Sequence, residues 1–358
     1  MTATFGNKIK FTIFGESHGL AIGCVIDGLP PGVALNLEGI RMEMQRRAPG
    51  KSKLATARQE KDAFIIQSGF FEGKTTGTPM CVLIPNSDQH SGDYSKLQNV
   101  MRPGHADYSG KVKYKGFNDY RGGGDFSGRL TVFLGAAAKQ ILAQRDIYVG
   151  AHIASIGNVQ DKMFNPLGET AVFLAGLTQK TFPVIDDGAG EDMQQLIWSA
   201  KQNCDSVGGV IECMAINMPA GVGEPFFDSL ESRLAHALFS VPAVKGIEFG
   251  KGFAFTQMPG SEANDQMYYD DGVVKTYTNN NGGITGGITN SMPVLFRVAV
   301  KPTPSIAKVQ KTVDLSSKTN TELVINGRHD PCIVQRAVPV IEGVAAWVLL
   351  DMLLAGEN

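Results

Sequence analysis

The chain has 358 residues, 43% of them hydrophobic, which is enough for one large domain or two ordinary ones. Its 33 Lys and Arg residues against 35 Asp and Glu give a formal charge of -2, so nucleic acid is not an expected partner and any bound anion must be held by local cations. The five scattered cysteines without a C-x-x-C pair predict buried free thiols. The absence of a signal-peptide pattern and the short apolar stretch at residues 344–354 predict a soluble, cytoplasmic protein without membrane contact.

Apolar runs predict strands at residues 21–26, 207–218 and 294–300, and Gly208-Gly209 indicates a bulge or close backbone approach. Helical periodicity is found at residues 38–46, 130–144, 191–203, 227–238 and 339–354. Because helices and strands do not alternate regularly, we expect an α+β fold with antiparallel sheets and covering helices. The glycine-rich residues 279–283, close to Gly286-Gly287, predict a tight loop that faces a ligand.

The first candidate for chemistry is Gly15-Glu16-Ser17-His18-Gly19, which follows a short apolar run. A histidine between glycines lies on backbone that can approach a ligand closely. The residues alone leave open whether His18 is catalytic or is a turn histidine held by a backbone carbonyl.

The second candidate is Arg102-Pro103-Gly104-His105-Ala106-Asp107, where Pro-Gly predicts a turn. Arg102 offers a fork for carboxylate or phosphate, His105 offers a proton near neutral pH, and Asp107 can fix the imidazole tautomer. The alternative is a surface turn in which the arginine and the aspartate pair only with each other.

The third candidate is the glycine-rich stretch at residues 120–129, which leads into the predicted helix at 130–144. Such a loop points backbone N–H groups and the positive end of the helix dipole at a phosphate or carboxylate. Arg129 would add a bidentate contact. The stretch lacks the strand and acidic residue of a dinucleotide fingerprint.

Cations also gather near the break Pro49-Gly50, and two further segments lie near the C-terminus. The cations are Arg46, Arg47, Lys51, Lys53, Arg58 and Lys61. They could bind a polyanionic substrate or form a solvated loop. Residues 301–305, Lys-Pro-Thr-Pro-Ser, put a cation and two hydroxyls on a stiff extended segment, and Asp330 precedes a proline beside Arg328 and His329.

Together and in this order, these motifs resemble those of the chorismate synthase family, from Phe14 to the end of the chain. The resemblance implies a single domain over residues 1–358, with antiparallel β-sheets sandwiched between helices in a β-α-β sandwich, and a homotetramer. It implies a lyase that eliminates phosphate in a trans-1,4 sense from 5-enolpyruvylshikimate-3-phosphate, the last common step of aromatic amino-acid biosynthesis. It also implies a requirement for reduced flavin mononucleotide (FMN) and no metal.

The resemblance assigns roles residue by residue. His18 is similar to the family residue that protonates the departing phosphate, His105 to the one that meets the flavin near N1, and Asp330 to the one that acts with the N5 hydrogen. Ser17 and Ser127 are counted with these catalytic residues. The implied flavin contacts are Asp125, Phe126, Ser127, Pro242, Ala243, Gly286, Lys301, Pro302, Thr303, Pro304, Ser305 and Arg328. The implied substrate contacts are Arg46, Arg47, Lys53, Arg102 and Arg129.

Two positions depart from the family pattern. Asp125-Phe126 stands where Arg-Ser is common, and Lys53 stands where Arg is frequent. Arg47 and Lys53 occupy positions sometimes assigned to NADP, but a trianionic substrate explains both cations, so we expect a separate flavin reductase or chemical reductant. The alternatives from other classes are a redox flavoprotein and a non-catalytic phosphate-metabolite binder.

Overall fold

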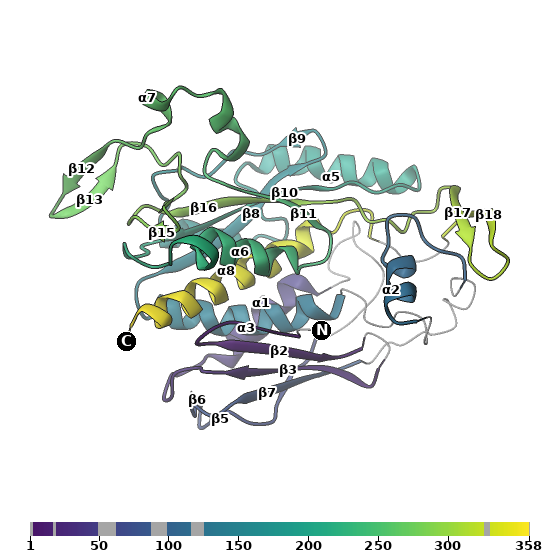
Figure 1. Cartoon of the computed structure of the whole chain (residues 1–358), viewed down its shortest axis with the longest axis horizontal. Coiled ribbons are helices and arrows are strands. Elements are labelled where there is room, and N and C mark those ends of the chain that lie inside the picture. Colours follow the sequence, from purple (N-terminus) through teal and green to yellow (C-terminus); the bar gives the residue numbers. More distant parts are fainter. Residues whose placement is uncertain are drawn as a thin grey trace.

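The computed structural model describes residues 3–16, 19–48, 62–86, 99–115, 125–325 and 330–357, with the backbone only for residues 125–127 (Figure 1). Within this part, two five-stranded antiparallel sheets enclose a layer of helices. The first sheet has the order β1 (Thr4–Phe5), β2 (Lys10–Gly15), β3 (Ala21–Asp27), β7 (Met80–Pro85), β4 (Ile65–Ile66). The second has the order β11 (Val244–Phe249), β16 (Val294–Val300), β10 (Gly209–Ile216), β8 (Tyr148–Ile156), β9 (Val159–Gln160).

The helices form two groups. Between the sheets lie α1 (Leu37–Arg47), α3 (Asp125–Ala143), α6 (Leu230–Phe239) and α8 (Val334–Gly356). The outer face of the second sheet is covered by α4 (Ala171–Gln179) and α5 (Asp187–Gln202). The remaining helices are the short α2 (Asp107–Lys113), α7 (Gly260–Ala263) and the 3₁₀ segments Phe226–Asp228 and Gly252–Gln257. The α+β class and the antiparallel sheets are confirmed. The order of the layers is corrected, because the two sheets enclose the main helical layer, whereas we expected the sheets to lie between helices.

In the described part of the chain, four small hairpins lie outside the two large sheets. They are β5 (Phe70–Phe71) with β6 (Lys74–Thr75), β12 (Met267–Asp270) with β13 (Val273–Thr276), β14 (Ile284–Thr285) with β15 (Ile288–Thr289), and β17 (Gln310–Asp314) with β18 (Thr319–Leu323). In Figure 1 the β17–β18 hairpin lies beside α2, away from the sandwich.

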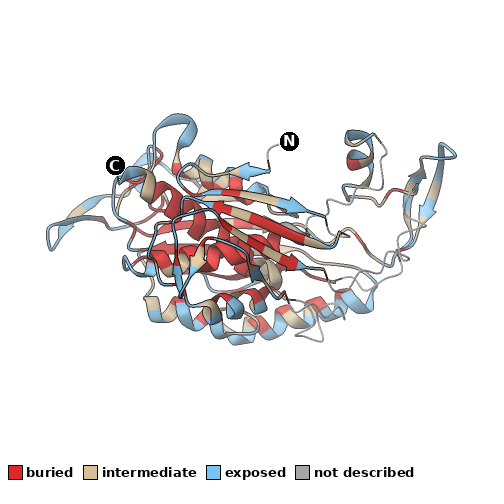
Figure 2. Ribbon diagram, turned by 90° about the horizontal axis from the view of Figure 1, so that it is seen from below, coloured by how far each residue is buried: buried red, intermediate tan, exposed pale blue. Residues whose placement is uncertain are grey.

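Helix α8 is the centre of the core. It packs along α3 where two glycines meet, because a Cβ on Gly135 would lie 2.1 Å from Cα of Gly343. This helix is long and apolar enough to cross a membrane, but 89% of its most apolar window is buried inside the protein (Figure 2). Its composition is therefore that of a core helix packed between two sheets.

The predicted elements are largely confirmed. The strand predicted at 294–300 is β16, the one at 21–26 lies within β3, and the one at 207–218 contains β10. The close approach at Gly208-Gly209 is also present, since a Cβ on Gly209 would meet the Ser155 carbonyl oxygen at 2.1 Å. The predicted helices begin and end within a few residues of those observed, except that α3 and α8 each begin five residues earlier.

Two expectations need correction. Cys24, Cys213 and Cys332 are buried free thiols, but Cys81 is half-buried and Cys204 is exposed. Residues 279–283 form a structural turn, because the Asn279 side chain donates to the carbonyls of Pro166 and Pro293 at 2.9 Å each and accepts from the Gly283 N–H at 2.7 Å. These amide groups are satisfied within the fold.

Candidate active site

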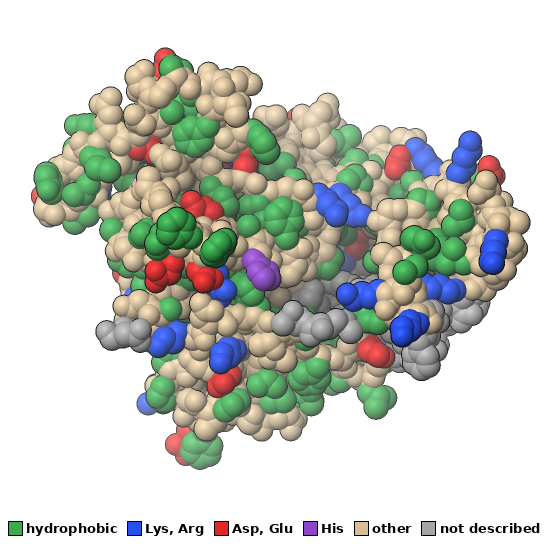
Figure 3. All heavy atoms as spheres, viewed as in Figure 1, with side chains coloured by type: hydrophobic (Ala, Val, Ile, Leu, Met, Phe, Trp, Pro, Cys, Tyr) green, Lys and Arg blue, Asp and Glu red, His purple; other side chains and the backbone are tan. Residues whose placement is uncertain are grey.

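A cavity of about 670 Å³ opens where the ends of several elements converge. Its volume falls within the range of about 300–1,000 Å³ typical of small-molecule sites. The residues that line it come from the turn before α2, the end of α1, the start of α3, the α6–β11 turn, the segment after β16 and the first turns of α8. Lys and Arg side chains gather around the recess between the α2 region and the sandwich (Figure 3). We call it the His105 cavity.

The cavity brings together predicted residues that are far apart in the sequence. Those that line it are Arg47, His105, Pro242, Ala243, Lys301, Thr303, Pro304 and Ser305. Gly128, which precedes the predicted Arg129, also lines it. Other predicted residues lie outside the described part of the chain: Ser17, His18, Lys53 and Arg328, together with the side chains of Asp125, Phe126 and Ser127.

His105 is oriented by Asp107. Its Nδ1 lies 2.6 Å from Oδ1 of Asp107 and 3.1 Å from Nη2 of Arg102. Because a carboxylate only accepts, the shorter contact favours the tautomer in which Nδ1 carries the proton and donates it to Asp107. Burial would raise the pKa of Asp107, but hydrogen bonds from Arg102 and His105 outweigh it and hold the pKa well below its usual range. The aspartate is therefore a fixed negative charge behind the imidazole.

Arg102 braces this turn. Its Nε and Nη2 donate to the two carboxylate oxygens of Asp107 at 2.7 and 2.8 Å, and its Nη1 donates to Oγ of Ser305 at 3.3 Å. The predicted Arg–Asp pair is therefore present, and it ties the turn to the segment after β16. Arg102 itself does not appear among the cavity-lining residues.

The segment at residues 301–305 forms one wall. The Lys301 ammonium donates to the carbonyl oxygen of Gly104 at 2.5 Å, and the Lys301 N–H donates to that of Ala243 at 2.9 Å. Ala243 has a φ of 72°, a left-handed conformation that alanine rarely adopts and that is often found at functional sites. Thr303 Oγ1 is buried without a hydrogen-bond partner among the described residues. The wall thus offers an unsatisfied polar atom on well-anchored backbone.

Arg47 lines another side of the cavity, and Asp62 and Arg129, which are not among the lining residues, lie behind it; we call these three residues the basic wall. Arg47 is almost fully buried, and its Nη1 lies 2.6 Å from Oδ2 of Asp62, while Nε of Arg129 lies 3.4 Å from Oδ1. With Lys245, Lys301 and Arg336, Arg47 gives the cavity several cationic side chains in its lining, which suits an anionic ligand. The sequence analysis predicts no role for Asp62.

Arg336 is a further residue that sequence reasoning missed. It lines the cavity from the first turn of α8 and donates from Nη1 to Oδ2 of Asp330 at 2.5 Å. Its Nε donates to the carbonyl oxygen of Arg47 at 3.1 Å. No local motif includes Arg336, so only its position beside the conspicuous Asp330-Pro331 could have drawn attention to it.

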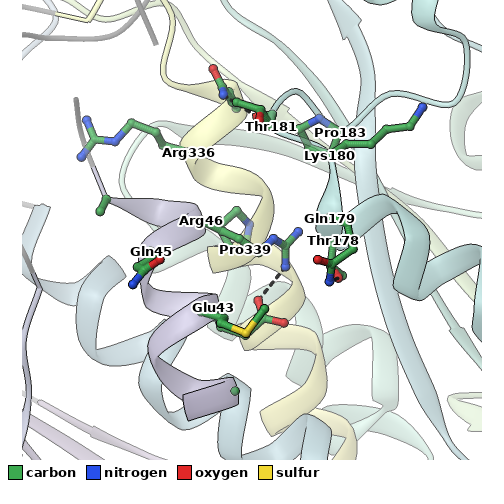
Figure 4. Close-up of a pocket in the computed structure, with 14 residues that line it drawn as sticks. Glu43, Gln45, Arg46, Thr178, Gln179, Lys180, Thr181, Pro183, Arg336 and Pro339 are labelled. Atoms are coloured by element: carbon green, nitrogen blue, oxygen red, sulfur yellow. Dashed lines mark hydrogen bonds and ion pairs between the residues drawn. The ribbon is translucent and has the colours of Figure 1, made fainter. Parts of the chain in front are cut away.

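Arg46, in contrast, faces a separate cavity of about 380 Å³, the Arg46 cavity (Figure 4). Its guanidinium lies 2.6 Å from Glu43 and 2.5 Å from Glu342, and Lys139 approaches both carboxylates. We call these four residues the buried ion cluster. Burial would raise the pKa of Glu342, but the charges of Arg46 and Lys139 outweigh it and lower the pKa to about 2. The position of Arg46 supports a structural role, and we leave it out of the proposed substrate site.

Gly286 and Pro302 are also not among the residues that line the His105 cavity. Gly286 lies in the β14–β15 turn, where the carbonyl oxygen of the next residue, Gly287, accepts from the N–H of Leu230. Its φ of 61° fits the tight turn. In the described structure, Gly286 has a structural role in this turn and does not line the cavity.

Comparisons with known proteins agree with this arrangement. Residues 9–354 match the family model for chorismate synthase. A chorismate synthase of Thermococcus gammatolerans is 48% identical over 353 residues, covering 98% of this chain and 97% of that protein. One of Dehalococcoides mccartyi is 45% identical over 357 residues, covering 99% and 97%. A crystal structure of chorismate synthase superposes with a TM-score of 0.74 at 27% identity, over 98% of this chain and 93% of that one. The chain therefore belongs to the chorismate synthase family.

Proposed function

We propose that this protein performs its family's reaction, the trans-1,4 elimination of phosphate from 5-enolpyruvylshikimate-3-phosphate, in the His105 cavity. The observation that carries the proposal is that this cavity joins an Asp107-oriented histidine to the basic wall. The substrate bears a phosphate and two carboxylates, so a cavity lined by cationic side chains and a proton-handling group suits it.

Reduced FMN is the proposed cofactor. The residues that would hold it are Lys301, Thr303 and Ser305 for its polar groups and Pro242 and Ala243 for its ring. They fit because Thr303 Oγ1 is a buried polar atom in need of a partner and the α6–β11 turn offers apolar surface. When bound, reduced flavin supplies an electron-rich centre that eases loss of phosphate and takes up the ring hydrogen, which no side chain here could remove unaided.

The protein contributes binding, orientation and protons. Arg47 holds an anionic group of the substrate, and Arg129, retained as a substrate contact on the family resemblance, lies behind it on the other oxygen of Asp62. His105 keeps its Nδ1 proton on Asp107 and presents Nε2 to the bound molecules. We retain His18 as the proposed donor to the leaving phosphate and Asp330 as the residue that acts near the transferred hydrogen, on the family resemblance alone.

Two other functions remain to be distinguished. A redox flavoprotein would pass hydride to its substrate and consume one reduced flavin in each turnover. A phosphate-metabolite binder would hold the substrate without releasing phosphate. The oriented His105 favours catalysis, because a binding site for anions needs only the arginines.

We further propose a single-domain, cytoplasmic homotetramer that receives reduced FMN from a separate reductase or a chemical reductant. Several large aromatic side chains are almost fully exposed, including Phe226 at 87%, Phe227 at 94% and Phe253 at 82%. Exposed apolar groups of this size are typical of surfaces that bind other subunits. Size-exclusion chromatography with light scattering tests the tetramer, and Phe227→Asp should dissociate it.

The proposed function is tested by an anaerobic assay that follows chorismate absorbance with purified protein, substrate and photoreduced FMN. We expect turnover with reduced FMN and none with oxidised FMN. Steady turnover with oxidised FMN and a reduced nicotinamide cofactor alone, in the dark, would contradict the separate source of reductant. No turnover under either condition would contradict the proposed activity.

A further inference from the structure

We infer that Arg336 is a positioning residue for Asp330, holding its carboxylate in the orientation that the reaction requires. The inference rests on the proposed function, in which Asp330 acts near the transferred hydrogen. It adds a residue that none of the sequence motifs contains.

The contacts of Arg336 point to this role. Its Nη1 and Oδ2 of Asp330 are 2.5 Å apart, and the two side chains are only 15% and 9% exposed. A charge-assisted hydrogen bond that is shielded from water fixes the direction of a carboxylate more tightly than an exposed pair does. The Nε of the same guanidinium donates to the Arg47 carbonyl at 3.1 Å. Arg336 therefore joins Asp330 to the end of α1, where the basic wall begins.

The scaffold behind Arg336 is rigid. The residue lies in the first turn of α8, a largely buried helix, and Glu342 of the buried ion cluster anchors α8 about one and a half turns further on. A positioning group on such an element is held more precisely than one on a loop. Asp330 itself lies on irregular chain next to Pro331, so its side chain depends on a partner for orientation.

The Arg336 side chain does not point into the neighbouring Arg46 cavity. Arg336 borders both cavities, but Figure 4 shows it pointing away from Lys180 and Thr181, which line the Arg46 cavity. Its polar contacts on the described chain lie on the side of Asp330 and Arg47. The guanidinium is therefore part of the His105 cavity and its surroundings.

A double-mutant cycle in kcat tests the inference, with enzyme saturated with reduced FMN under anaerobic conditions. The variants are Arg336→Gln, Asp330→Asn and the double variant, with Arg336→Lys as a milder change if the glutamine folds poorly. The matched control is Arg233→Gln, because Arg233 also pairs with an aspartate of α8, Asp351 at 3.3 Å, and is 12% exposed, but does not line the His105 cavity. Thermal unfolding of each variant shows whether the fold is kept.

We expect Arg336→Gln to lower kcat about 100-fold, the scale on which a small misplacement of a reacting group acts, with KM changed little. If Arg336 acts on the reaction through Asp330, the double variant should be no slower than the slower single variant. Arg233→Gln should lose stability but keep kcat.

Two results would overturn the inference alone: normal kcat in Arg336→Gln while Asp330→Asn is slow, or losses that multiply in the double variant. Normal kcat in Asp330→Asn would overturn the role of Asp330 on which the inference rests. Wild-type enzyme without chorismate formation would overturn the proposed function itself.

Discussion

Removing the charge of Glu342 is expected to destabilise the protein strongly. This carboxylate is 1% exposed and accepts from Arg46 at 2.5 and 2.9 Å, from Lys139 at 2.9 Å and from the Ala151 N–H at 3.1 Å. In Glu342→Gln two buried cations would share only Glu43. Breaking a buried pair in this way costs about 3–5 kcal/mol of unfolding free energy.

Urea unfolding followed by circular dichroism measures the loss, with Glu38→Gln as the control. Glu38 also pairs with an arginine, Arg41, but both side chains are more than half exposed, so this change should cost less than about 1 kcal/mol. Because the folded pKa of Glu342 is lowered, its contribution is fully present above the ordinary glutamate pKa of about 4.3 and is lost as pH falls toward about 2. Equal losses in the two variants at neutral pH would refute the reasoning.

Three further changes have expected outcomes. Asp107→Asn should lower kcat about 100-fold or more, close to the loss in His105→Ala, because the amide no longer fixes the imidazole tautomer. Steady-state kinetics that give kcat and KM for both variants check this. Gly135→Ala should cost about 1–3 kcal/mol because its Cβ would collide with α8, whereas Gly176→Ala, whose Cβ meets nothing within 4 Å, should be neutral or stabilising in thermal unfolding. Burial would lower the pKa of His152, but the hydrogen bonds that its ring donates to the carboxylates of Asp161 and Glu212 outweigh burial and raise the pKa. Its contribution to stability is therefore present below the ordinary pKa of about 6.5 and falls as pH rises through the folded pKa, and His152→Gln should remove this pH dependence from denaturant titrations.

Much of the fold could be predicted because local patterns agree with the tertiary structure. The strand β16 shows a continuous apolar run, and α1 has a clear helical period with Asn36 capping its first turn. The strand β8 was not predicted, since nearly all its residues are buried on both faces and no alternation of polar and apolar residues marks it. The early start of α8 was missed because Pro339 suggests a first turn, whereas the helix continues through it.

From local patterns alone, a contact in the candidate site is predictable only where one motif holds both partners, whereas cavity-lining residues such as Pro242, Ala243 and Thr303 are assigned by the family resemblance. His105 and Asp107 are two residues apart, so their contact follows from one turn. Arg46 and Arg47 are adjacent on α1 and point about 100° apart, so one lines the His105 cavity and the other joins the buried ion cluster. The sequence cannot say which arginine takes which side. The contacts of Asp62 and Arg336 depend on tertiary packing and leave no local signal.

The central claim is that the His105 cavity eliminates phosphate without net oxidation of the flavin. The most direct test records chorismate, inorganic phosphate and the absorbance of reduced FMN in one anaerobic reaction, with substrate in large excess over flavin. We predict equal amounts of chorismate and phosphate, over many turnovers, with the flavin still reduced at the end. Oxidation of one flavin for each turnover, or binding of substrate without release of phosphate, would contradict the account.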